Sequence, residues 1–237
     1  WKEGYGYTVA TEMYSAGIER LTHQPLSFSV SETTEGVHIH IIDAELMGKG
    51  EKEKKDLYIE GVQNNGIINH YEYIINSEGT IEIRHVLKPE GKMPLWFPRI
   101  GLTLTVSDAL DQVKWYGRGP QENYPDRKTG YPMGIYASTV QAMYEPYLMP
   151  QDYGLRTDVR WLQLTTDKGI GLQFKMNEWF NFNIYPYSTD NLTKAMYTYQ
   201  LQKQKGMTLN LDYATTGVGC TARGVFGAYK AMPQEYR

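Results

Sequence analysis

Apolar and polar residues alternate with a period of two along much of this sequence, which is the pattern of half-buried β-strands. Four runs show it most clearly: Val37–Ile41, Ile100–Val106, Ile170–Met176 and Leu209–Tyr213. Glycine-containing breaks border such runs, as hairpin turns require. These breaks are Glu35-Gly36, Ser77-Glu-Gly79 and Asp167-Lys-Gly169. We therefore expect short strands connected by tight turns.

Helical periodicity is nearly absent. The best candidate is a short helix over Thr189–Met196, capped by Thr189 or Asp190. We find no internal repeat, low-complexity tract or Pro/Ser-rich linker. The pattern therefore predicts a single all-β domain over residues 1–237, in which two large antiparallel sheets pack face to face.

Composition narrows the classes of partner. The chain has 24 Lys and Arg against 27 Asp and Glu, a net charge of -3, which argues against nucleic acid. No apolar run approaches the length of a membrane span. The single cysteine, Cys220, excludes an intrachain disulfide and a cysteine-rich metal site.

The run Trp115–Lys128, called the signature loop below, is the densest chemical feature of the sequence. Two glycines and two prolines restrict its backbone to special conformations, so we expect a rigid loop that is neither helix nor regular strand. Loops of this kind often carry function.

Glu122 and Asp126 in this loop resemble the carboxylate pair that retaining glycosidases use. Nearby basic residues favour ion pairs and lowered pKa values for both carboxylates, whereas an acid catalyst needs a raised pKa. We therefore interpret them as partners in structural salt bridges. The chain also lacks a nucleophile elbow, a phosphate loop and a dinucleotide fingerprint, so we expect no catalytic residue in it.

His38 and His40 lie two positions apart on a predicted strand, so both rings point to the same face. Zinc requires at least a third ligand, and the sequence suggests none nearby. The polar face of an ordinary strand is the favoured interpretation, and no metal site is predicted. The other histidines carry no motif; they are His23, His70 and His85.

Alternating rings and amides over Trp179–Tyr187 have two interpretations. The rings can stack on a sugar while the amides bind its hydroxyls. Alternatively, Phe180 and Phe182 belong to the core and the tyrosine hydroxyls bind backbone groups. We favour the second.

Five motifs together resemble the C-terminal domain of bacterial β-galactosidases of glycoside hydrolase family 2. They occur in the order of that family and cover the chain from about Leu26 to its end. They are Phe97–Gly101, Trp115–Lys128, Pro150–Trp161, Phe180–Phe182, and Leu209–Tyr213 with Gly217-Val-Gly219.

The resemblance implies a β-supersandwich similar to galactose mutarotases, as the last domain of a longer retaining enzyme that hydrolyses terminal β-D-galactosides. The catalytic glutamates and the divalent and monovalent metal sites would lie in upstream domains, so no cofactor is expected here. Expected partners are those upstream catalytic domains, the galactoside substrate and further copies of the chain. The location is left open between bacterial cytoplasm and periplasm. The loop residues expected to act structurally are Arg118, Glu122, Asn123, Asp126 and Arg127.

The sequence departs from the family pattern in three places. Well-known members carry a Trp shortly after Gly-Val-Gly that stacks on the bound sugar or aglycone, whereas Cys220–Gly224 contains none. The family often has a His where Tyr197 stands, and its usual lead-in before Trp1 is missing, as in an excised piece. Within Gly217–Phe226 the candidates for flanking substrate are Thr221, Arg223 and Phe226.

Two alternatives remain. One is a free-standing mutarotase-like aldose epimerase, which needs a His and a Glu facing the anomeric carbon of the sugar. The other is a carbohydrate-binding module without catalysis.

Overall fold

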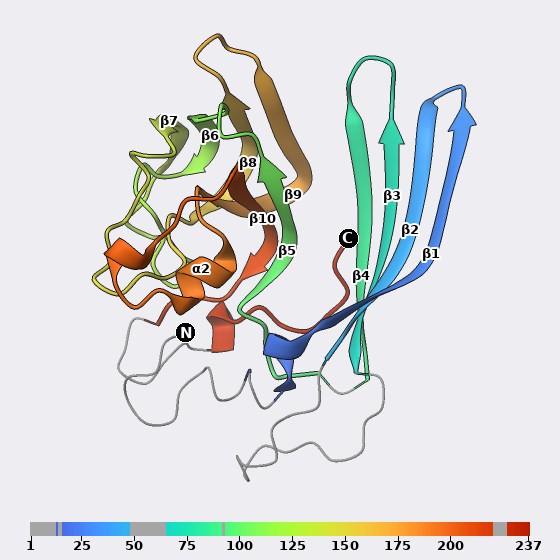
Figure 1. Ribbon diagram of the computed structural model, residues 1–237, viewed down its shortest axis with the longest axis horizontal. Helices are drawn as coiled ribbons and strands as arrows, with labels where there is room; N and C mark the ends of the chain where they lie inside the picture. Colours follow the sequence, from blue (N-terminus) through green and yellow to red (C-terminus); the bar gives the residue numbers. More distant parts are fainter. Residues whose placement is uncertain (1–12, 14–15, 48–64, 92, 220–226) are drawn as a thin grey trace. The chain divides into compact units, whose positions relative to one another are not determined.

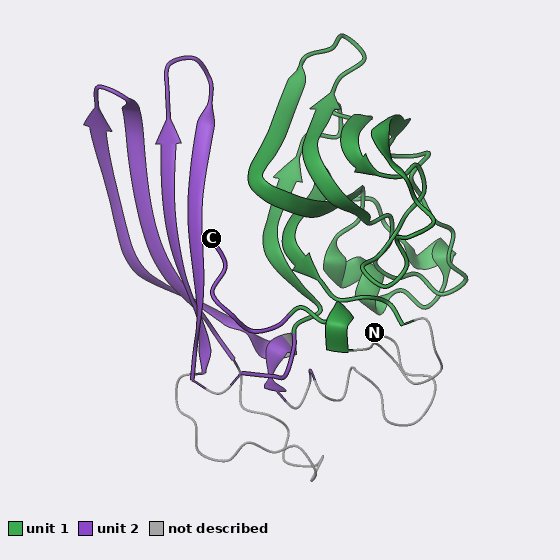
Figure 2. Ribbon diagram, turned by 180° about the vertical axis from the view of Figure 1, so that it is seen from behind, with its two compact units in different colours: residues 1–2, 97–231 green, residues 3–96, 232–237 purple. Residues whose placement is uncertain are grey.

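The computed structural model describes residues 13, 16–47, 65–91, 93–219 and 227–237, and these form an all-β structure with two antiparallel sheets (Figure 1). The chain divides into two compact units (Figure 2). The six-stranded unit consists mainly of Phe97–Ala231, and the four-stranded unit consists of Glu3–Trp96 with Met232–Arg237. The all-β prediction is confirmed, while the single domain over residues 1–237 stays a prediction.

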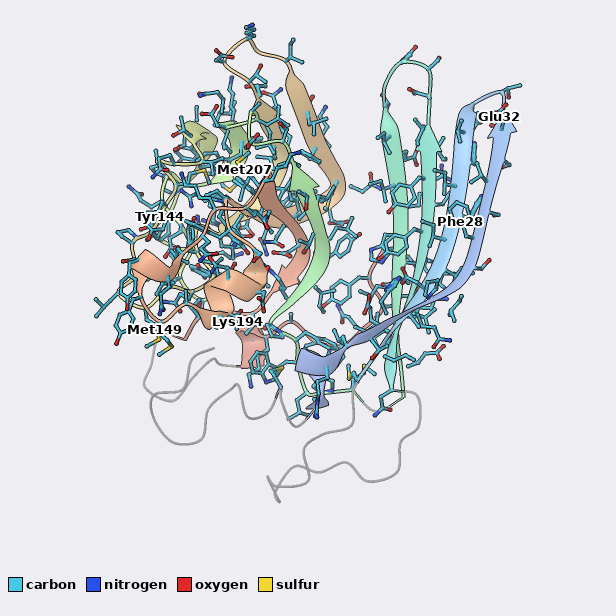
Figure 3. The ribbon with its side chains drawn as sticks, viewed as in Figure 1. Phe28, Glu32, Tyr144, Met149, Lys194 and Met207 are labelled. Carbon is cyan, nitrogen blue, oxygen red and sulfur yellow. The ribbon has the colours of Figure 1, made fainter. Side chains whose placement is uncertain are left out.

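The four-stranded unit contains an antiparallel meander in the order β1-β2-β3-β4. Its strands are β1 (Thr22–Thr33), β2 (Gly36–Leu46), β3 (Gly66–Ile75) and β4 (Ile81–Glu90), preceded by the 3-10 turn η1 (Ile18–Arg20). One face of this sheet carries exposed apolar side chains, among them Phe28 of β1, which Figure 3 labels.

The six-stranded unit contains a sheet in the order β5-β10-β9-β8-β6-β7. Its strands are β5 (Arg99–Val106), β6 (Gln112–Arg118), β7 (Met133–Thr139), β8 (Arg156–Thr165), β9 (Gly171–Tyr185) and β10 (Met207–Thr215). Its helical segments are α2 (Thr189–Lys194), η2 (Thr198–Gln200) and η3 (Gly227–Tyr229). The short helix was predicted, but its N-cap is Ser188, whose hydroxyl accepts from the backbone N–H of Asn191. The predicted caps Thr189 and Asp190 lie inside the helix.

Alternation along the central strands gives the six-stranded sheet two different faces. Phe180, Phe182 and Ile184 of β9 and Leu209 and Leu211 of β10 point into one apolar core with Trp115 of β6. The residues that alternate with them are polar: Asn183, Asn210 and Asp212 are buried, and Asn181 is half-buried. One face of this sheet is therefore an apolar core, and the opposite face is a buried polar layer.

The glycine breaks form the turns that the sequence predicts, between β1 and β2, β3 and β4, and β8 and β9. One prediction was wrong: Trp115–Arg118, the start of the signature loop, belongs to β6. Gly117 suits this strand because a Cβ there would lie 2.8 Å from Cγ2 of Val159 on the paired strand β8. No helix in the described ranges is long and apolar enough to cross a membrane.

Candidate functional site: the signature loop and the polar layer

Glu122 is a buried carboxylate with four hydrogen-bond donors. Its Oε1 accepts from Nη2 of Arg127 at 2.9 Å and from the hydroxyl of Tyr147. Its Oε2 accepts from the backbone N–H of Gly154 at 2.9 Å and the hydroxyl of Tyr124 at 3.2 Å. A carboxylate has about four acceptor sites, so these donors occupy its capacity. The salt bridge predicted for Glu122 is confirmed, with Arg127 as its partner.

Asn123 fastens the signature loop to the strand that starts at Arg156. Its Oδ1 accepts from the backbone N–H and the hydroxyl of Thr157, at 3.1 and 2.5 Å. Its own backbone N–H donates to the carbonyl of Leu155 at 2.8 Å. Asn123 is fully buried, and each of these bonds satisfies a group that would otherwise be costly to bury.

Asp158 joins the two ends of the loop through a pair of basic side chains. Nε of Arg118 and Nζ of Lys128 both donate to its carboxylate. Burial acts to raise the pKa of Asp158, but Lys128 and Arg118 outweigh it, so the pKa is lowered. Two basic residues of the loop, Arg118 and Lys128, are thus bound by an acid outside it, a partner that the sequence did not indicate.

Asp126 binds backbone N–H groups. The prediction that it pairs with the neighbouring bases was wrong, because within the described part of the chain it forms no ion pair with them. Its carboxylate accepts from the N–H of Val218 at 3.2 Å and of Gly219 at 2.7 Å. A Cβ at Gly217 would lie 2.4 Å from the carboxyl carbon of Asp126. Asp126 therefore clasps the Gly217–Gly219 segment against the signature loop.

The polar layer of the six-stranded sheet is built from cross-strand rows. Thr103, Asn210 and Asn183 lie opposite one another on β5, β10 and β9. The hydroxyl of Thr103 donates to Oδ1 of Asn210 at 2.8 Å, and Nδ2 of Asn210 donates to Oδ1 of Asn183 at 2.8 Å. Neighbouring strands therefore share a continuous chain of hydrogen bonds.

Arg99 is the cation of this layer. Its Nη2 donates to Oδ2 of Asp212 at 2.9 Å and to Oδ1 of Asn183 at 3.2 Å. Burial raises the pKa of Asp212 to about 6, against the opposing effect of Arg99. A raised pKa is one mark of an acid catalyst, but Asp212 is only 1% exposed. Its place beside Arg99 makes it part of the sheet's framework.

The aromatic run at the end of β9 has two interpretations, sugar binding or core packing, and its phenylalanines follow the second. Phe180 and Phe182 are core residues, as predicted. The hydroxyl of Tyr185 donates to the carboxylate of Asp152 at 3.1 Å, so the backbone partner expected for it was wrong. Trp179 is exposed, and the guanidinium of Arg160 lies 4.1 Å from its ring centroid.

Hydrogen bonds connect the five sequence motifs, since Oδ1 of Asn181, in Phe180–Phe182, also accepts from the backbone N–H of Asp158 at 3.3 Å. The signature loop binds Pro150–Trp161, and the polar layer joins residues of Phe97–Gly101 and Leu209–Tyr213. Sequence reasoning missed the roles of Arg99, Asp158 and Asp212, although all three lie inside quoted motifs. The substrate-flanking candidates Thr221, Arg223 and Phe226 lie outside the described residues.

In the four-stranded unit, the structure corrects the expectation that no third ligand lies near His38 and His40. Glu72 of β3 approaches both rings, and ligand atoms of the three residues all lie within 4.8 Å of one another. This cluster is separate from the signature loop and is considered further below.

Fold and site define an all-β protein whose buried acids and bases are largely bound to one another in structural clusters. Comparison with known proteins identifies the family. A family model described as "Beta galactosidase small chain" matches residues 11–237. This chain therefore belongs to the β-galactosidase small-chain family.

Relatives with the printed name β-galactosidase match parts of the chain. The protein from Priestia megaterium is 38% identical over 147 residues, which is 62% of this chain and 14% of the relative. The protein from Vibrio cholerae is 39% identical over 122 residues, which is 52% of this chain and 11% of the relative. The matched region thus spans about a seventh or less of each of these relatives.

Proposed function

We propose that this chain is the non-catalytic C-terminal domain of a retaining family 2 β-galactosidase that hydrolyses terminal β-D-galactosides. In that enzyme it supports the catalytic barrel and borders the aglycone side of the active site. The short match to much longer β-galactosidases supports a domain that works within a larger protein. The saturated carboxylate of Glu122 supports a structural rather than a catalytic loop.

The observation that carries the proposal is the clasp between Asp126 and the Gly217–Gly219 segment. This segment leads directly into Cys220–Phe226, where substrate-flanking residues were predicted. Two backbone N–H groups bound to one carboxylate fix the position of the chain at Val218 and Gly219. The signature loop then acts on substrate indirectly, by holding its neighbour in position.

A chimera tests this function. The region of the Priestia megaterium β-galactosidase that corresponds to this chain is replaced by residues 1–237, and hydrolysis of o-nitrophenyl β-D-galactoside is measured. We expect an active enzyme. In it Asp126→Ala should lower kcat/KM at least tenfold, because the segment that borders the aglycone loses the carboxylate that holds it in position. Asp190→Ala on the exposed surface of α2 serves as the matched control and leaves kcat/KM unchanged.

Either of two results would overturn the proposal. One is a folded chimera, shown by circular dichroism, without activity. The other is an active chimera in which Asp126→Ala and Asp190→Ala behave alike. Rapid mutarotation of fresh galactose by the chain alone, followed by polarimetry, would instead favour the epimerase. Tight binding of galactose in calorimetry would favour the carbohydrate-binding module.

A further inference from the structure

A cluster of two imidazoles and one carboxylate lies on one face of the four-stranded sheet. His38 and His40 are alternate residues of β2, so their rings project from the same face. The pairing of β2 with β3 puts Glu72 directly opposite His40. Oε1 of Glu72 lies 3.7 Å from Nδ1 of His38 and 3.8 Å from Nε2 of His40.

These separations are too long for hydrogen bonds, for which N···O distances reach about 3.2 Å. They are close to the spacing of ligands around one small cation. Metal–ligand distances of zinc place neighbouring ligand atoms about 3.3–3.5 Å apart in a tetrahedron. Small side-chain rotations therefore suffice to bring the three atoms into one coordination sphere.

The other ring nitrogen of His38 faces a second carboxylate. Its Nε2 is buried and has no hydrogen-bond partner within the described part of the chain. A carboxylate oxygen of Glu35 lies 4.0 Å away. Imidazoles that bind metal through one nitrogen usually donate the other N–H to a carboxylate. Glu35 is in the position of that outer partner if Nδ1 of His38 binds the ion.

Glu72 is oriented by a neighbouring cation. Nη1 of Arg84 donates to its Oε2 at 2.9 Å, and Nε of Arg84 donates to Glu82 at 2.8 Å. Arg84 therefore occupies one oxygen of Glu72 and leaves Oε1 directed at the two rings. Ligating carboxylates are commonly held in this way.

We propose that His38, His40 and Glu72 bind a divalent transition metal of the zinc class, with water completing the coordination. Two imidazoles and one carboxylate suit zinc better than magnesium or calcium, which prefer oxygen ligands throughout. The ion would tie β2 to β3 on this face. The site belongs to the four-stranded unit and does not depend on the β-galactosidase assignment.

Zinc titration by calorimetry tests this site in the 237-residue chain after treatment with EDTA and desalting. We expect one zinc ion per chain and an affinity at least tenfold lower in His40→Gln and in Glu72→Gln. His40 is half exposed, so its replacement leaves the fold intact, which circular dichroism checks. His70→Gln is the matched control, because His70 lies on β3 two residues from Glu72 and on the same face. Bound cobalt should show the visible absorption of a tetrahedral site in the wild type and lose it in His40→Gln.

His23 supplies a second control, because it lies 2.9 Å from Glu45 and 4.0 Å from Asp43 on the same sheet. Zinc affinity that falls in His23→Gln but not in His40→Gln would place the ion elsewhere and overturn the proposal. A wild-type chain that binds no zinc at a concentration of about 100 μM, which corresponds to a binding free energy of about -5.5 kcal/mol, would overturn it as well.

Discussion

The six-stranded and four-stranded units use the same ionisable side chains in different ways. In the six-stranded unit Glu122 has four donors, and Asp158 and Asp212 are each bound to arginine. In the four-stranded unit the rings of His38 and His40 face Glu72 at distances beyond hydrogen bonding. Acids and bases that saturate one another stabilise a fold, whereas groups that converge without bonding keep the capacity to bind something else.

The difference also concerns where the charge lies. Glu122 is buried at the junction of two motifs, so its loss leaves several hydrogen-bond donors without their acceptor. The acids around Arg84 are more accessible to water, which screens their pairs. The four predictions that follow test this contrast, from the largest expected effect to the smallest.

Glu122→Ala should cause the largest loss of stability. The replacement leaves the backbone N–H of Gly154 and the hydroxyls of Tyr124 and Tyr147 without their acceptor, at a cost of about 1–3 kcal/mol for each group that stays buried and unsatisfied. Urea unfolding, followed by hydrogen exchange in peptides from the six-stranded unit, measures the change in the free energy of unfolding. Glu178→Ala, at an exposed position of β9, is the control and should stay within about 0.5 kcal/mol. A loss below about 1 kcal/mol for Glu122→Ala would contradict the contrast.

Acid should destabilise the four-stranded unit through His85. Burial lowers the pKa of His85 to about 4, from 6.5 in the unfolded chain, and Asp43 only partly opposes this. Between these values the unfolded chain binds more protons, so stability is complete above pH 6.5 and falls as the pH drops towards 4. The loss should be of order 1–3 kcal/mol.

The ring of His85 bonds to Asn69 and stacks on Tyr71, so His85→Gln tests the effect directly. The free energy of unfolding is measured from pH 4 to pH 7 in both proteins. Its dependence on pH should be flatter in the variant. Parallel curves for variant and wild type would show that His85 is not the source.

Gly217→Ala should weaken the clasp around Asp126. The added methyl group would lie 2.4–2.6 Å from the carboxylate of Asp126. The carboxylate must therefore move away from the backbone N–H groups that donate hydrogen bonds to it. We expect a loss of about 1–3 kcal/mol in thermal unfolding. Gly130→Ala has open space around its Cβ and should change stability by less than about 0.5 kcal/mol. Equal effects of the two replacements would count against a specific clasp.

Glu82→Ala should have the smallest effect. The pair between Glu82 and Arg84 has both side chains more than half exposed, and such pairs contribute about 0–1 kcal/mol. Thermal unfolding at low and high salt measures the contribution, which should shrink further with salt. A loss comparable to that of Glu122→Ala would remove the distinction between the two units.

Much of the fold could be predicted because its signals are local. Alternation of apolar and polar residues marks the strands β2, β5 and β10. Glycine-containing breaks mark the turns between β1 and β2 and between β8 and β9. The strand over Trp115–Arg118 could not be predicted, because Gly117 there suits the close approach of β8. That approach is a tertiary feature, and in the sequence alone the glycine suggested a loop.

The candidate sites depended still more on tertiary structure. The sequence predicted that the acids of the signature loop would pair with bases, and Glu122 does so with Arg127. It could not predict that Asp126 would bind the backbone 92 residues further along the chain. Glu72 was missed for the same reason, because only the register of β2 and β3 brings it opposite His40.

Hydrolysis of o-nitrophenyl β-D-galactoside by residues 1–237 alone tests most directly whether the signature loop acts structurally. The saturated carboxylate of Glu122 and the backbone-bound carboxylate of Asp126 predict no turnover above the buffer rate. Turnover by the purified chain that disappears in the folded variant Glu122→Gln would contradict the account, since it would make the loop a catalytic site.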